Sequence, residues 1–191
     1  MPNAPLQAFQ YLDAFVIVGL SLIIGKLLID YRRKNGNMLS TISKTVVATK
    51  QSSLVFTLSM LVAFPLYYAW VWLWVGPVLA MPKWFYAAVA VSAFAEMMFV
   101  LVPASSGWKQ KVHEVAASFV GSVMVAIPLM FLIWSPQISP IVQQAIYAYI
   151  VACFVLVVLL VVPKYRKYTL VYEIIFCIAF WSVMSVAGHL S

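Results

Sequence analysis

Residues 96–128, EMMFVLVPASSGWKQKVHEVAASFVGSVMVAIP, decide how this chain is organised. The stretch places a carboxylate, Glu96, inside one apolar run and continues through a short basic turn. His113 and Glu114 then open a second apolar run. The rest of the chain consists of further apolar runs and short connectors. This pattern predicts helices that cross a membrane and are joined by turns.

The composition also indicates a membrane protein. Of the 191 residues, 65% are hydrophobic and 9% are charged, which is too few charged side chains to cover a soluble globule. The net charge is +7, but the basic residues occur in short connectors. A nucleic-acid-binding protein needs a basic face, so we do not expect nucleic acid as a partner.

Six apolar runs are each long enough to span a bilayer, since about 20 helical residues are needed to cross it. We therefore expect an all-α, polytopic integral membrane protein in which six transmembrane helices form one compact bundle. The whole chain, 1–191, is predicted to be a single domain. The predicted spans are 12–29, 54–75, 84–102, 113–134, 141–162 and 168–190.

Prolines and aromatic residues refine this picture. Pro65 is expected to kink the second span, because proline removes one helical hydrogen bond, and Pro128 interrupts the fourth. The aromatic residues near the end of the second span predict a belt at the membrane surface: Tyr67, Tyr68, Trp70, Trp72 and Trp74. In the connector before this span, apolar residues at helical spacing favour either a short interfacial helix or an extension of the span: Met38, Leu39, Ile42 and Val46.

Charge asymmetry predicts the orientation. Connectors 30–53, 104–112 and 163–167 contain ten basic residues, whereas the other side has Lys83. Positive charge is retained in the cytoplasm, so these three connectors should be cytoplasmic. We expect a multi-pass protein of the cell membrane with both termini external.

Five ionisable residues from four spans are predicted to gather in the cytoplasmic half: Lys26, Glu96, His113, Glu114 and Glu173. A charge in the hydrocarbon costs roughly 2.5–3.5 kcal/mol on insertion scales, so such groups usually face the bundle and form pairs. We expect Lys26 to turn inward and pair with Glu96 or Glu173. The five residues are candidate ligand-binding residues, although a buried ion-pair network that only specifies packing would give the same pattern.

Several chemistries lack the residues that they need. His113-Glu114 begins like a zinc-binding HExxH motif, but Ala117 occupies the position of the second histidine. The two histidines, His113 and His189, should lie at opposite membrane faces and cannot share a metal or haem. We therefore expect no metal site and no cofactor, and we assign no catalytic residue. Asp13 and His189 are both predicted near the outer face, where they could form a structural pair.

The order Pro103, a short polar turn, His113, Ala116 and Ala117 resembles the six-helix DRAM-type membrane proteins and their uncharacterised prokaryotic relatives. In that family, a histidine opens the fourth helix after a proline that ends the third. The resemblance covers about 40 residues and the number of spans. It implies a lipid-linked or membrane-organising role without established catalysis, and it implies no cofactor.

Three classes of function are compatible with the sequence. The first is a protein that binds a lipid or small amphiphile at a polar pocket in the inner leaflet. The second is a non-catalytic assembly subunit, which would contact another membrane protein or form a homo-oligomer. The third, which we favour least, is an intramembrane enzyme that uses Glu96, His113 and Glu173 in acid–base catalysis.

The orientation can be tested by labelling. Residue 139 lies in a connector that we predict to be external, so a Ser139→Cys variant without Cys153 and Cys177 should react with an impermeant maleimide added outside intact cells. A cysteine at Lys164 should react only after the membrane is opened. Labelling of residue 139 from the cytoplasmic side alone would reverse the orientation.

Overall fold

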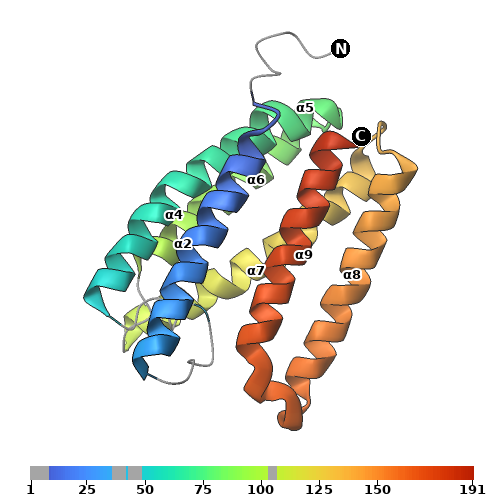
Figure 1. The fold of residues 1–191 in the computed structure, drawn as a ribbon. Helices are drawn as coiled ribbons and strands as arrows, with labels where there is room; N and C mark the ends of the chain where they lie inside the picture. The colour runs from blue at the N-terminus through green and yellow to red at the C-terminus, as the bar shows by residue number, and fades with distance from the viewer. Residues whose placement is uncertain (1–8, 36–41, 43–48, 103–106) are drawn as a thin grey trace.

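The computed structural model describes residues 9–35, 42, 49–102 and 107–191. Within this part of the chain the structure is all-helical, and six helices are long and apolar enough to cross a membrane. They form a compact bundle (Figure 1). The predicted fold class is confirmed, and the chain is a multi-pass membrane protein by the length and composition of its helices.

The six spans are continuous helices with short connectors. Their bounds in chain order are α2 Leu12–Asn35, α4 Lys50–Trp70 extended by the π-helical turn η1 Val71–Val75 and by α5 Gly76–Val78, α6 Lys83–Leu101, α7 Trp108–Trp134, α8 Pro140–Val161 and α9 Thr169–His189. A 3-10 segment, η2, joins the last two helices at Pro163–Tyr168. Pro65 and Pro128 lie within helices that continue past them.

Helix ends differ from the prediction where a helix extends beyond its apolar run. The helix α2 continues to Asn35, because basic residues in a last turn are stabilised by the helix dipole. Thr49 and Ser52 form a capping box that starts α4 at Lys50. The helix α7 begins at Trp108, after Gly107 and before the start predicted for the fourth span, so His113 lies in its second turn.

The connector before α4 was expected to contain an interfacial helix or an extension of the second span. Residues 36–41 and 43–48 lie outside the described part of the chain, so both expectations stay predictions. The exception is Ile42, whose backbone N–H donates to Oε2 of Glu173 at 2.7 Å.

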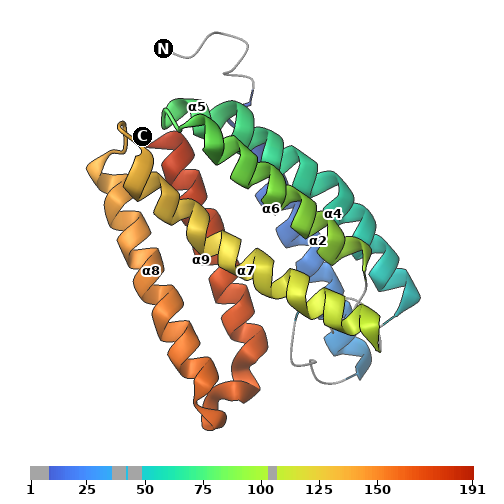
Figure 2. The same ribbon diagram turned by 180° about the vertical axis from the view of Figure 1, so that it is seen from behind.

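The helices form two groups that α7 connects. In both views α2, α4 and α6 lie side by side, α8 and α9 form a hairpin, and α7 crosses diagonally between the groups (Figures 1 and 2). We call the end where α2 begins and α9 ends the terminal end, and the opposite end the basic end. The two groups diverge toward the basic end (Figure 2).

The predicted aromatic belt is wrong for four of its five residues. The exposed fractions are 2% for Tyr67, 7% for Tyr68, 0% for Trp70 and 7% for Trp74, whereas Trp72 is 41% exposed. The rings of Tyr67 and Trp181, on α9, have centroids 4.5 Å apart. The buried residues recur at three- and four-residue spacing, so they form one helix face that packs against α9.

Gly188 allows this close approach. A Cβ atom built on Gly188 would lie 2.5 Å from Cζ2 of Trp70, a large buried side chain without room to move. We expect Gly188→Ala to destabilise the protein by about 1–3 kcal/mol, as overpacking usually does. Thermal unfolding in detergent measures the effect.

Gly121→Ala is the matched control, because nothing lies within 4 Å of a Cβ atom at that position. Alanine is favoured over glycine within a helix by roughly 0.5–1 kcal/mol, so this variant should be neutral or stabilised. If Gly188→Ala and Gly121→Ala unfolded at the same temperature, the packing of Trp70 would not require a glycine at position 188.

Candidate functional site

Two of the five predicted site residues face outward. The ammonium group of Lys26 pairs with Asp30, and the two side chains are 73% and 50% exposed. Oε1 of Glu114 accepts a hydrogen bond from Gln110 at 2.8 Å on the surface of α7. The predicted inward pairing of Lys26 with Glu96 or Glu173 is therefore wrong. A carboxylate four residues away on the same helix is a nearer partner than one inside the bundle.

His113 lies in the core, where it connects two helices. It is 7% exposed, and its Nδ1 lies 2.9 Å from the carbonyl oxygen of Val102. This carbonyl group can only accept, so Nδ1 carries the hydrogen. Val102 is the C-cap of α6, whose last carbonyl groups lack helical partners. His113 therefore closes the end of α6 against α7, and its ring packs on Phe99 with centroids 4.4 Å apart.

Glu96 is the buried carboxylic acid of α6, with 7% of its surface exposed. It interacts with the side chain of Tyr68 on α4. Its Oε2 atom and the hydroxyl of Tyr67 are the two buried side-chain polar atoms without a hydrogen-bond partner in the described part of the chain. Tyr67 interacts electrostatically with Glu96. These groups form a polar centre within the helix bundle that is incompletely satisfied.

Glu173 lies one turn before Cys177 on α9, and this thiol interacts electrostatically with both Glu173 and Glu96. Cys177 therefore interacts with acidic residues on two helices, Glu96 on α6 and Glu173 on α9. His113 is at the α6–α7 contact, and Lys26 and Glu114 are on the surface. The five predicted residues do not converge on one pocket.

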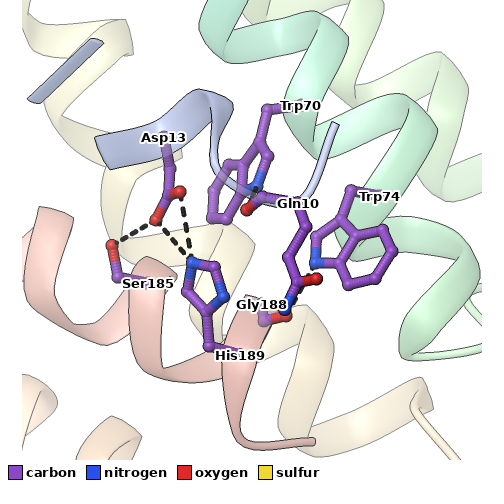
Figure 3. Close-up of polar contacts among 7 residues, drawn as sticks. All are labelled: Gln10, Asp13, Trp70, Trp74, Ser185, Gly188 and His189. Atoms are coloured by element: carbon purple, nitrogen blue, oxygen red, sulfur yellow. Dashed lines mark hydrogen bonds and ion pairs between the residues drawn. The ribbon is translucent and has the colours of Figure 1, made fainter. Parts of the chain in front are cut away.

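A second polar cluster lies at the terminal end (Figure 3). Asp13, on α2, is 1% exposed. Its Oδ2 accepts from the hydroxyl of Ser185 at 2.7 Å and lies 3.1 Å from Nε2 of His189. The predicted pairing of Asp13 with His189 is confirmed. Ser185 and His189 are four residues apart on one face of α9, so a single carboxylate engages both.

Two tryptophans extend this cluster to the second span (Figure 3). Nε1 of Trp74 donates to the carbonyl of Gly188 at 2.7 Å, and Nε1 of Trp70 donates to the carbonyl of Gln10 at 3.3 Å. The cluster therefore connects α2, the second span and α9. The hydroxyl of Ser185 donates to the carboxylate rather than to the imidazole, so the cluster does not have the serine–histidine hydrogen bond of a catalytic triad.

A groove of about 450 Å³ lies between α6 and α7. Its lining is apolar except at Lys111 and comprises Val91, Phe94, Ala95, Met98, Lys111, Val112, Val115, Ala116 and Phe119. Ligand sites in proteins usually measure roughly 300–1,000 Å³, so the groove is large enough to hold a ligand. A second groove, between α8 and α9, has a smaller volume of about 260 Å³.

Sequence reasoning missed Tyr67, Tyr68, Ser185 and Lys111. Tyr67 and Tyr68 were assigned to an aromatic belt, although the spacing of the buried aromatic residues was available as a signal. The i, i+4 spacing of Ser185 and His189 could also have been used. The groove depends on the distance between two helices, for which one sequence gives no signal.

Comparisons with known proteins add no relative. No family model, no curated protein and no solved structure matches the chain. The resemblance to the DRAM-type membrane proteins stays a prediction from residues 103–117.

The cluster at the terminal end predicts how stability depends on Asp13. Asp13→Ala leaves Ser185 and His189 without their shared acceptor, but the His189 side chain is 25% exposed and can be solvated. We therefore expect a loss of about 1–3 kcal/mol in detergent, the cost of an unsatisfied buried group, rather than the larger cost of a stranded buried charge.

Asp30→Ala is the control on the same helix. Its partner, Lys26, is exposed, and such surface pairs contribute about 0–1 kcal/mol. If both variants melted at the same temperature, Asp13 would not hold α2 to α9.

Proposed function

We propose that this protein binds a lipid or another small amphiphile in the groove between α6 and α7. The observation that carries the proposal is a ligand-sized apolar groove with a single lysine, Lys111, in its lining. An amphiphile has the complementary chemistry, because its apolar chain can lie in the groove while its polar end meets the lysine.

The shape of the groove supports an apolar chain. Ala95, Val112 and Ala116 are at least partly buried, whereas Phe94 and Val115 are 69% and 71% exposed. The small side chains of Ala95 and Ala116 leave space for an extended chain beside the more exposed side chains.

The charge of Lys111 favours an anionic headgroup. Lys111 lies in the first turn of α7, at the basic end of the bundle. A lysine near a helix end extends its ammonium group toward the membrane surface, where it can bind a phosphate group. We propose that this end faces the cytoplasm and that both termini are external, so the occupant is an anionic lipid of the inner leaflet.

The proposed site differs from the sequence-based one. The sequence-based site was expected inside the bundle and comprised five candidate residues: Lys26, Glu96, His113, Glu114 and Glu173. In the proposal, none of these residues binds the ligand directly. His113 contributes by holding the end of α6 against α7, which sets the width of the groove.

Native mass spectrometry of the protein released from vesicles of phosphatidylcholine and phosphatidylglycerol tests the proposal. We expect the protein to retain phosphatidylglycerol. Ala95→Phe fills the groove with a side chain and should lower the retained fraction severalfold. Lys111→Gln should remove the preference for the anionic lipid while retaining a chain in the groove.

Ala87→Phe and Lys109→Gln are the matched controls, since both residues are exposed and do not line the groove. They should bind lipid as the original protein does. Equal retention by Ala95→Phe and Ala87→Phe would show that lipid covers the whole surface without preference for this groove, and the proposal would be overturned.

A further inference from the structure

The polar centre within the bundle, formed by Glu96, Tyr68 and Tyr67, contains titratable groups that the proposed lipid binding does not use. Glu96 forms no ion pair within the described residues, and its Oε2 has no hydrogen-bond partner. The hydroxyl of Tyr67, which is 2% exposed, also has none. A buried polar atom without a partner is costly, so two such atoms in adjacent spans indicate a function beyond packing.

The side chains that interact with Glu96 are titratable groups rather than cations. They are Tyr68 and Tyr67 on α4 and Cys177 on α9. On α7 the titratable group nearest the end of α6 is His113, whose Nδ1 is occupied by Val102. Tyr67, Tyr68 and Cys177 can each exchange a proton, and Glu96 forms no ion pair with a cation within the described residues.

Toward the terminal end, the polar centre is close to the Asp13 cluster. The rings of Tyr67 and Trp70 have centroids 5.9 Å apart, and those of Trp70 and His189 are 6.4 Å apart. Tyr67 also interacts electrostatically with Asp13. His189 is 25% exposed in its side chain, whereas Asp13 is 2% exposed, so the imidazole is the outer member of this pair.

Toward the basic end, the thiol of Cys177 interacts electrostatically with both Glu96 of the polar centre and Glu173. Glu173 lies in the second turn of α9, near the start of the helix, and accepts the backbone N–H of Ile42. Acidic groups therefore lie near both ends of the bundle as well as at its centre.

We propose that these groups form a path along which protons cross the membrane, with Glu96 as the central carboxyl group that accepts and releases the proton. The order is His189, Asp13, Tyr67, Glu96 and Glu173. Chains of acidic residues and histidines within membrane spans are used for this purpose in pumps and transporters.

One complete passage moves one proton and returns every group to its starting state. Glu96, which starts with a proton, releases it toward Glu173 and the aqueous phase. The Tyr67 hydroxyl then gives its proton to Glu96 and accepts one on its oxygen from Asp13, which had received that proton from His189. The two unpartnered oxygen atoms are polar positions at which water would connect the groups. No electron moves, and the membrane gradient sets the direction.

Proton flux into liposomes tests this proposal. The purified protein is reconstituted with a pH-sensitive dye inside, and a potassium diffusion potential with valinomycin drives protons inward. We expect a flux severalfold above that of protein-free liposomes. Glu96→Gln should reduce it to the protein-free level, and Tyr67→Phe should reduce it strongly, since phenylalanine lacks the hydroxyl.

Glu114→Gln is the matched control, because that carboxylate is exposed and bonded to Gln110, and it should carry the original flux. Glu96→Asp keeps a carboxyl group and should restore part of the flux lost in Glu96→Gln, which separates lost chemistry from lost folding. No flux above protein-free liposomes, or full flux in Glu96→Gln, would overturn the proposal.

A hydrophobic carbodiimide provides an independent measurement. The reagent adds to carboxylic acids that carry a proton in apolar surroundings, so it should modify Glu96 in the intact protein. The modified protein should lose its flux. Flux that persists after complete modification of Glu96 would exclude this residue from the path. Lipid binding in the α6–α7 groove, measured on the same sample, should be unchanged, because the groove is lined by other residues.

Discussion

The contact of the second span with α9 at the terminal end is the constraint on which the bundle depends. The helix groups α2, α4 and α6 on one side and α8 and α9 on the other diverge toward the basic end. Trp70 can pack against α9 because Gly188 has no side chain, and Trp74 bonds to the carbonyl of the same glycine. Asp13 adds two hydrogen bonds from α2. In a bilayer, where apolar side chains gain little from leaving lipid, such close packing and polar contacts hold helices together.

The fold class could be predicted from sequence, because the length and hydropathy of a membrane-spanning helix are local properties. The choice between lipid-facing and core aromatic residues is not local. Tyr67 and Trp70 are residue types that are typical of an aromatic belt, but their spacing is typical of a buried helix face. Packing against the partner helix, α9, places both side chains in the core. The helix start at Trp108 could not be predicted for a related reason, since apolar runs mark the membrane and not the first helical turn.

The candidate site was harder to predict than the fold. Lys26 and Glu114 each lie within four residues of a polar partner on their own helix, and this local pairing kept them at the surface. Glu96 has no such neighbour in the described structure and stays buried with an unpartnered oxygen. The proposed groove could not be derived, because its volume depends on how α6 and α7 approach one another.

The π-helical turn at Val71–Val75 also affects how this chain can change. A π turn holds one more residue than an α turn, so a single deletion there would leave a regular α-helix. Each kind of turn completes one rotation, so everything after the deletion would keep its side relative to α4. Met81, whose N–H donates to the carbonyl of Gly76, and Leu79, whose carbonyl accepts from Ser135, would still face the same partners. A deletion elsewhere in α4 would instead rotate all that follows by about 100°, so this turn is the place where the second span can lose a residue without a new connector to α6.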